Sequence, residues 1–175
     1  MHCELESAFD ALRGGGGTDN GPRIVLLESL DDVRRWMNVE EGTARATLKG
    51  FKQISIDEAL ELRRDDPELG AVVERAARLG LPLLECAYPE TDADVAELLP
   101  SPISRRLNAL PLVSSGGRLA VLLNDPEGAR PIEFAISRRV VPILARLSLV
   151  RLGLSRQFDR SEDEAMVRRL GLDLR

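Results

Sequence analysis

A glycine-bent hairpin is the feature that most constrains how this chain can fold. Residues 109–113 and 118–123 are two apolar runs, and Ser114–Gly117 between them has the composition of a turn. Glycine supplies the positive φ that a tight hairpin turn needs, so the pattern predicts a strand, a turn and a second strand. Asn124–Pro126 then ends the second strand, because proline lacks the N–H that a ladder requires. The chain is therefore expected to contain a sheet.

The core of this protein must be aliphatic. The 175 residues are enough for one good core or for two small subdomains in contact. Aromatic residues make up only 3% of the chain, so Leu, Val, Ile and Ala must fill the interior. The formal net charge is -5, which argues against a broad electrostatic contact with nucleic acid.

The cellular compartment is predicted from what the sequence lacks. Cys3 and Cys86 are too few and too far apart for a disulfide framework, which favours a reducing compartment. No apolar run approaches the roughly 18–20 residues of a membrane span. The N-terminus carries scattered charges and no hydrophobic signal core. We therefore expect a cytoplasmic protein without direct membrane insertion.

Periodicity and capping signals predict the elements before the hairpin. Ser55–Glu58 is a capping box, and Asp66–Pro67 is typical of a helix start. Residues 4–13 can form a short helix, which Gly14–Gly17 separates from the rest as a linker. Residues 38–53 have no assignable pattern. The expected strands cover 23–28 and 81–85, and the expected helices cover 30–37, 55–64, 67–79, 91–99 and 101–108.

The region around the hairpin resembles a known family. An Asp- and Leu-rich helix ending at Leu98–Pro100 precedes the apolar Leu110–Leu112. The glycine turn is then followed by Leu119–Val121, Asp125–Pro126 and Val140–Ala145. Over roughly residues 80–158 this order is similar to the N-terminal domain of type II secretion and type IV pilus assembly ATPases, the secretion system protein E family. The resemblance contains no catalytic signature. It implies a protein–protein docking or regulatory module, which binds the cytoplasmic part of an inner-membrane component and works with a separate or fused ATPase.

Residues 129–139 give conflicting signals. Ile132, Phe134 and Ile136 alternate with a period of two, which favours a strand. The family resemblance instead implies a short helix that leads into a strand over 140–145. We predict the helix, since one strand running directly into another would leave no turn between them. Ser137–Arg138 stands where the family has glycine.

The end of the chain is predicted to be helical. Leu147, Val150, Leu154 and Phe158 share one face of a helix, and Ser161–Glu164 is a capping box that opens a second, terminal helix.

The predicted fold class is α+β, with a small mixed or antiparallel sheet and short helices packed on it. The chain is expected to form one unit or two small subdomains. The predicted division is a flexible segment over 1–22, a mostly helical part with one strand over 23–80, an α+β part over 81–158 and a C-terminal helix or tail over 159–175.

Three features argue against an enzyme. The single histidine, His2, lies in the N-terminal segment, where no nucleophile pair is expected. No residues have the spacing of a zinc site. A phosphate loop with its Gly-Lys-Ser/Thr is missing, although nucleotide hydrolysis would need one. We therefore predict no catalytic residue, no metal and no cofactor.

The alternative function is a second-messenger site of the same ATPase family, whose cyclic di-GMP motif opens with Arg-Leu-Gly. Arg78–Leu79–Gly80 matches that opening and Leu83–Leu84 continues it, while Ala87 replaces the motif glycine and the expected glutamine is missing. Arg151–Gly153 repeats the opening alone. A second interpretation is purely structural, since a cation suits a helix C-terminus and glycine suits its cap.

The docking surface is expected at two arginine pairs on short helices. These pairs are Arg105–Arg106 and Arg138–Arg139. They would form the polar rim of a modest interface with an apolar centre. The protein would then lie at the inner membrane through its partner.

Overall fold

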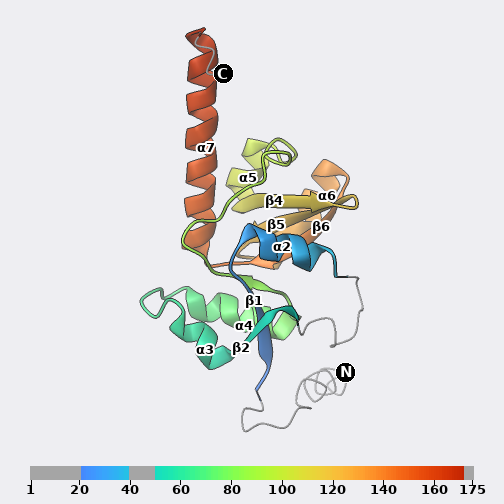
Figure 1. The fold of residues 1–175 in the computed structure, drawn as a ribbon, viewed down its shortest axis with the longest axis vertical. Helices are drawn as coiled ribbons and strands as arrows, with labels where there is room; N and C mark the ends of the chain where they lie inside the picture. The colour runs from blue at the N-terminus through green and yellow to red at the C-terminus, as the bar shows by residue number, and fades with distance from the viewer. Residues whose placement is uncertain (1–20, 40–49, 172–175) are drawn as a thin grey trace.

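The fold is a six-stranded mixed sheet with helices on both faces (Figure 1). The computed structural model describes residues 21–39 and 50–171. The strand order is β2-β1-β3-β6-β5-β4, in which β1, β3, β6 and β5 are parallel and the edge strands β2 and β4 are antiparallel to their neighbours. The predicted α+β class is confirmed, and the sheet is mixed. The predictions for residues 1–20 lie outside the described residues.

The elements have the following bounds. The strands are β1 (Arg23–Leu27), β2 (Lys52–Ser55), β3 (Leu83–Leu84), β4 (Ala109–Ser115), β5 (Arg118–Leu123) and β6 (Arg139–Leu144). The α-helices are α2 (Leu30–Met37), α3 (Ile56–Glu61), α4 (Leu69–Leu79), α5 (Ser101–Leu107), α6 (Ala129–Ile136) and α7 (Leu147–Arg169), and η2 (Pro126–Gly128) is a short 3-10 helix.

The predicted hairpin is confirmed as β4–β5. Gly116 and Gly117 form its turn with φ of +59° and +77°, the left-handed conformation that glycine adopts without strain. The register shifts between Pro111 and Val113, so the edge strand β4 contains an irregularity. Proline is tolerated at such a position because an edge strand leaves N–H positions unpaired.

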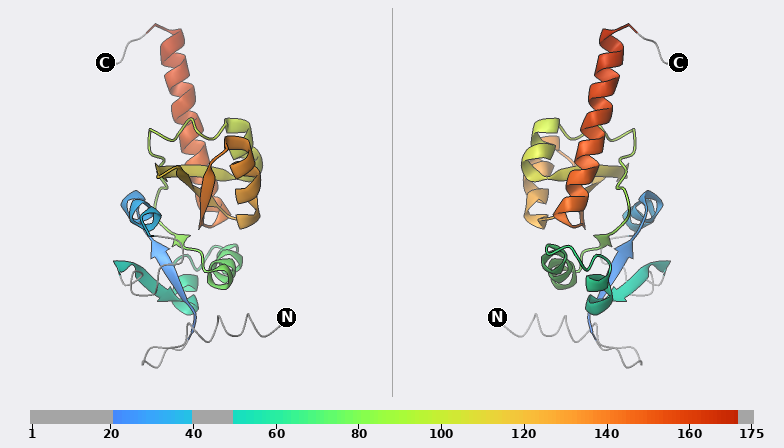
Figure 2. Two further views of the ribbon diagram at one scale, coloured as in Figure 1. Left: turned by 90° about the vertical axis from the view of Figure 1, so that its right-hand side faces the viewer. Right: turned by 90° about the vertical axis from the view of Figure 1, so that its left-hand side faces the viewer.

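The two faces of the sheet are covered by different helices (Figures 1 and 2). Along β5, Ala120 and Leu122 point to the face covered by α2 and α7, while Leu119 and Val121 point to the face covered by α5 and α6. The helices α3 and α4 cover the β1–β2 end of that second face. Both faces of the central strands are therefore buried, which explains their continuous apolar runs.

Helix α6 resolves the conflict over residues 129–139. Ile132 is fully buried and Ile136 is partly buried against the same cluster, as expected for positions i and i+4 on one helix face. Phe134 lies on the opposite face. The helix ends at Ser137 with φ +54°, so serine adopts the left-handed conformation that glycine would adopt without a steric penalty.

Local capping chemistry is confirmed at α3. The Ser55 hydroxyl accepts a hydrogen bond from the Glu58 N–H at 3.2 Å and donates one to the Glu58 carboxylate at 3.3 Å. The predicted strand over 23–28 and helix over 30–37 also occur, as β1 and α2. β2 lies in the segment 38–53 that sequence reasoning left unassigned, of which residues 40–49 lie outside the described part.

The helix predicted over 91–99 is wrong. The segment consists of successive turns, in which the Val95 N–H donates to the Asp92 carbonyl and the Leu98 N–H donates to the Val95 carbonyl. The Asp92 N–H instead donates to the Leu112 carbonyl at 2.9 Å. Val95 and Leu99 are buried, as their apolar spacing predicts, but a hydrogen bond to β4 takes the place of the helix.

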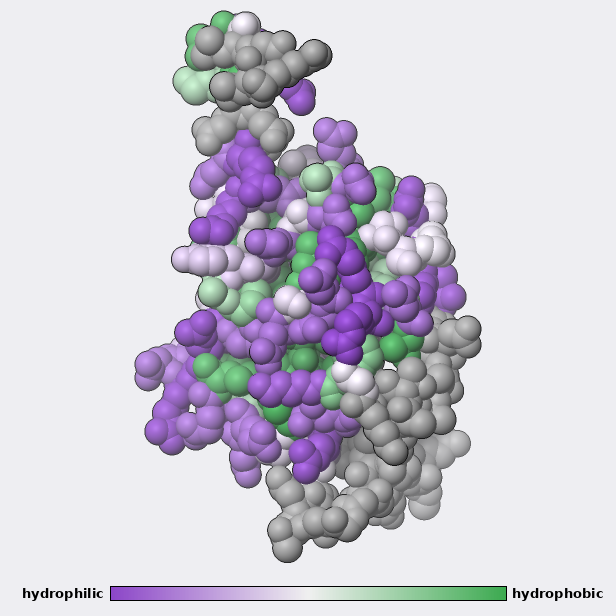
Figure 3. Space-filling view, in the orientation of Figure 1, coloured by the Kyte–Doolittle hydropathy of each residue, from purple (hydrophilic) through white to green (hydrophobic). Residues whose placement is uncertain are grey.

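The two helices predicted after residue 146 are one. α7 runs without a break for 23 residues and passes through the predicted start at Ser161. Its first turns pack on the sheet through Leu149, Val150 and Leu154, and its far end projects beyond the body (Figures 1 and 2). Met166 and Leu170 are exposed near that end, where Figure 3 shows an apolar patch.

No helix among the described residues is long and apolar enough to cross a membrane.

Substitution of Gly153 tests how closely α7 packs against Leu110 and Pro89. A Cβ at this buried position would lie 2.5 Å from Leu110 Cδ2 and 2.8 Å from Pro89 Cγ. Leu110 and Pro89 are themselves buried, so moving either side chain would disturb the close packing around it. We expect Gly153→Ala to lower the free energy of unfolding by about 1–3 kcal/mol, measured by urea denaturation.

The matched control is Gly70→Ala in α4, where a Cβ would meet no atom within 4 Å. Helix propensity alone should then raise the stability by about 0.5–1 kcal/mol. Equal effects of the two substitutions would contradict the close approach of α7.

Candidate functional site

A cluster of charged side chains lies where β3, β6 and the loop before α4 meet. Arg146 binds Glu85 in a bidentate manner, through Nε at 2.8 Å and Nη2 at 2.7 Å. Its Nη1 donates to Asp66 at 2.8 Å, and the Ser148 hydroxyl donates to the same Asp66 oxygen at 2.8 Å. Arg63 adds a contact to Glu85 at 3.1 Å. We call these five side chains the Arg146 cluster.

The sheet register explains why Arg146 and Glu85 meet. β3 and β6 are parallel neighbours with Leu83 opposite Leu144. Glu85 and Arg146 each come two residues later in the chain, so they lie side by side just beyond the carboxyl ends of β3 and β6. Asp66 had been predicted as the N-cap of a helix starting at Pro67. Its Oδ1 does accept from the Glu68 N–H, but α4 starts at Leu69 and the other oxygen binds Arg146.

Three members of the cluster are nearly shielded from water, while Arg63 and Ser148 are exposed. The exposed side-chain fractions are 11% for Arg146, 8% for Glu85 and 15% for Asp66. Hydrogen bonding to Arg146 holds the pKa of Asp66 below its usual range. Hydrogen bonding to Glu85 raises the pKa of Arg146, although desolvation acts in the opposite direction. Asp66 and Arg146 are therefore charged at neutral pH.

The Arg146 cluster is best interpreted as structural. It lies at the carboxyl ends of parallel strands, where open α/β sheets bind their ligands. However, its charges neutralise one another, and among the described residues no buried side-chain nitrogen or oxygen lacks a hydrogen-bond partner. Little is left at this edge for an incoming ligand.

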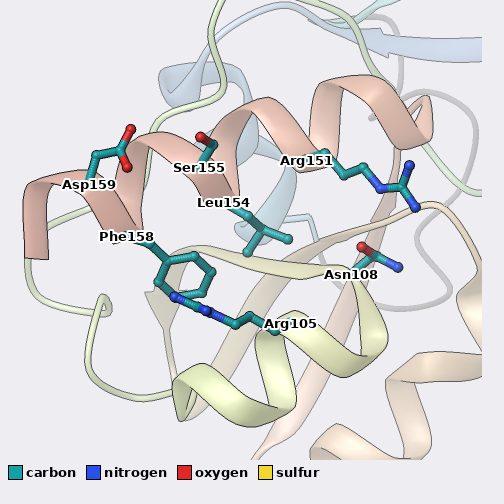
Figure 4. Close-up of a pocket in the computed structure, with 7 residues that line it drawn as sticks. All are labelled: Arg105, Asn108, Arg151, Leu154, Ser155, Phe158 and Asp159. Atoms are coloured by element: carbon teal, nitrogen blue, oxygen red, sulfur yellow. The ribbon is translucent and has the colours of Figure 1, made fainter. Parts of the chain in front are cut away.

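A depression of about 360 Å³ lies between α5 and α7 (Figure 4). Leu154 and Phe158 of α7 form its apolar side, and the Arg105 guanidinium stacks on the Phe158 ring at 4.1 Å from the centroid. Arg151 and Asn108 line the other end. Ser155 and Asp159 complete the lining. Two guanidinium groups beside an apolar wall are suited to an anionic group that carries an apolar body.

This depression joins two residues that the sequence treated separately. Arg105 is one of the predicted docking arginines, and Arg151 belongs to the repeated Arg-Leu-Gly tripeptide. No local sequence pattern predicts that α5 and α7 are neighbours, because their contact depends on how both pack on β4.

The two predicted docking pairs lie on exposed surface. Arg105 and Arg106 are in the last turn of α5, while Arg138 and Arg139 follow α6, and all four are exposed. Both helices pack against the same buried cluster on one face of the sheet. The structure does not bring the two pairs into contact with one another, so a partner would have to span both helices to bind them together.

The Arg78–Leu79–Gly80 turn is a helix C-cap. Gly80 has φ +65°, and the Leu81 N–H donates to the Ala76 carbonyl, which closes the last turn of α4. All three residues are exposed. The capping interpretation therefore accounts for the glycine, and the turn is also accessible to a ligand. Ala87, which replaces the motif glycine, is not among the residues with positive φ, so alanine causes no backbone strain there.

Reactive groups do not gather in the described part of the chain. Within residues 21–39 and 50–171 no group of three or more His, Cys, Asp and Glu side chains could hold a metal ion. Cys86 is a free thiol whose pKa is raised by burial, and so it is not an activated nucleophile. His2 and Cys3 lie outside the described residues.

The hairpin, the parallel β5–β6 pair and α6 between them occur in the order that the resemblance implied. The predicted resemblance to the N-terminal domains of secretion and pilus ATPases is confirmed by a family model that matches this part of the chain. The domain type is specific, because residues 79–164 match the family model described as the MshEN domain.

Three solved structures match this chain at low sequence identity. A structure of MshE with cdg has a TM-score of 0.44 and 22% identity, covering 58% of this chain and 86% of that chain. The N-terminal domain of XpsE has a TM-score of 0.45 and 19% identity, covering 74% of this chain and 86% of that chain. A second crystal form of it has a TM-score of 0.43 and 19% identity, covering 87% and 91%. No significant match occurs among curated proteins.

The Arg146 cluster predicts a strong effect on stability. Arg146→Met would leave the buried Glu85 carboxylate without its bidentate partner, so we expect a loss of about 3–5 kcal/mol in the free energy of unfolding. Asp66→Asn should cost less, and its effect should depend on pH.

The pH dependence follows from the lowered pKa of Asp66. A carboxyl group whose pKa is lower in the folded state stabilises the protein above its unfolded pKa of about 4, and this contribution is lost as the pH falls through the folded value. Urea denaturation of wild type and Asp66→Asn should therefore differ at pH 7 and converge below about pH 4. A constant difference across this range would contradict the assignment.

Proposed function

We propose that this chain is a non-catalytic docking and regulatory module of a type II secretion or type IV pilus ATPase. Its partner would be the cytoplasmic part of an inner-membrane component. The observation that carries the proposal is the match of residues 79–164 to the MshEN domain. The protein would then act at the cytoplasmic side of the inner membrane, held there through its partner.

The arrangement of α5 and α6 supports a docking role. Both helices are fixed by a fully buried cluster that includes Ile132, Leu119 and Val121. Arg105 and Arg106 lie in the last turn of α5, while Arg138 and Arg139 directly follow α6. Arginine is enriched at protein interfaces. A rigid surface loses little conformational entropy on binding, which suits a module that transmits force or position.

The chemistry of the chain supports a non-catalytic role. The sequence has no Gly-x4-Gly-Lys phosphate loop, which nucleotide hydrolysis on this type of machine requires. The Arg146 cluster is internally neutralised, and the α5–α7 depression offers binding groups without a nucleophile and base pair.

The docking proposal is tested by titrating the protein with the purified cytoplasmic domain of the inner-membrane component of the same system. We expect a dissociation constant below about 100 μM. Replacing the docking arginines by glutamate, in pairs, should weaken binding at least about tenfold, because each reversal places a like charge against the acidic side of the interface.

The matched control is the pair Arg168→Glu and Arg169→Glu, also adjacent and exposed, near the end of α7. This variant should bind as wild type does. Absence of binding by the wild-type protein at about 100 μM would contradict the docking function itself.

A second candidate is binding of cyclic di-GMP at the Arg78–Leu79–Gly80 turn. Two observations favour it: the MshEN match begins at residue 79, within this turn, and a similar structure is described as MshE with cdg. The turn is exposed, and Arg78 has no ion-pair partner among the described residues. Its guanidinium is therefore available to a phosphate group.

Isothermal titration calorimetry with cyclic di-GMP tests this candidate. If the turn binds the nucleotide, wild type should release or absorb heat, and Arg78→Ala should reduce the affinity at least about tenfold through loss of a charge-assisted contact. Arg168→Ala serves as the control. No heat with wild type at about 100 μM ligand would remove this candidate and leave the docking function untouched.

A further inference from the structure

Phe134 is the most exposed large hydrophobic side chain in the described part of the chain. It lies in α6 with 91% of its surface open to solvent. The helix itself is firmly docked, because Ile132 on its inner face is fully buried. Phe134 is therefore exposed although α6 itself is packed against the sheet.

The surroundings of Phe134 form a short apolar stripe with a cation at each end. Pro131 is exposed three residues before Phe134, so the two side chains share one face of α6, and the adjacent Ala135 is also exposed. Arg130 precedes the stripe and Arg138 follows it. Within residues 21–39 and 50–171, neither arginine forms an ion pair.

The nearest acidic side chain does not neutralise this stripe. The Glu133 carboxylate accepts a hydrogen bond from the Val140 N–H at 2.9 Å, so it is turned toward β6. Both arginines are exposed and add positive charge to the surface beside Phe134. Their charge complements an acidic surface on another molecule.

Two other exposed apolar side chains offer no uncovered aromatic ring. Tyr88 is covered by Arg156, whose guanidinium carbon lies 3.7 Å from the ring centroid. Leu79 belongs to the cap of α4. An aromatic anchor with arginines at its rim is the composition that dominates binding energy at protein interfaces.

We propose that Phe134 is the anchor of the docking surface and inserts into an apolar pocket of the partner whose rim carries carboxylates. Arg130 and Arg138 would meet those carboxylates at the edge of the contact. This inference rests on the proposed docking function and adds the surface and the chemistry of the partner. A membrane surface is the less favoured occupant, because two cations on an acidic chain give little attraction to anionic lipid.

The test uses the full chain, the partner's cytoplasmic domain as the probe, and titration by calorimetry. Phe134→Ser should weaken binding at least about thirtyfold, because loss of a buried aromatic anchor is the costliest single change at an interface. Arg138→Glu should weaken it less, by about three- to tenfold, and should reduce the dependence of affinity on salt concentration. The control is Met166→Ser, which removes an exposed apolar side chain at the distant end of α7.

Thermal unfolding separates binding from folding. Phe134→Ser should melt within about 2 °C of wild type, because the side chain is exposed and makes no core contact. Equal binding by Phe134→Ser and wild type would overturn this inference and leave the docking function standing. No binding by wild type would overturn both. Binding of phosphatidylglycerol vesicles that depends on Phe134, with unchanged affinity for the partner domain, would also overturn the inference in favour of a lipid surface.

Discussion

The pairing of β3 with β6 is the constraint on which the rest of this structure depends. β3 has only two residues, yet it joins the β2–β1 end of the sheet to the β6–β5–β4 end. The Arg146–Glu85 contact reinforces the junction where both strands end, and Asp66 extends it to the start of α4. A bidentate, nearly buried ion pair is costly to break, because separation would leave a carboxylate without a partner in a dry environment.

This junction joins two regions of the chain, one before and one within the segment that matches the family model, into a single sheet. The MshEN match covers residues 79–164, which include β3, the hairpin, β6 and most of α7. β1 and β2 precede the matched segment but continue the same sheet. The surfaces of α5 and α6 are consequently held on a rigid frame, which favours recognition of a partner by shape and charge over chemistry at a reactive centre.

Elements that depend on short-range signals were predicted correctly from the sequence. The glycine pair at 116–117 predicted the hairpin, the Ser55 capping box predicted the start of α3, and residues 129–136 proved helical. The predictions failed where a backbone group finds its hydrogen-bond partner in a distant segment and not within its own. Residues 91–99 have helical spacing, but the Asp92 N–H finds its acceptor on β4 and the segment forms turns. Residues 52–55 lack a distinctive pattern and became a strand by pairing with β1.

The sequence by itself determined the α+β class, the hairpin and most helices, because turns, caps and apolar periods act over a few residues. The order of its motifs also carried the family resemblance. Only the tertiary structure decided that Glu85 and Arg146, separated by 61 positions, form the central ion pair, and that Arg105 and Arg151 line one depression. It also decided that Phe134, which shares a period-two pattern with the buried Ile132 and the partly buried Ile136, faces solvent. The physical reason is that strand order and helix placement are set by long-range packing, which no local pattern of residues encodes.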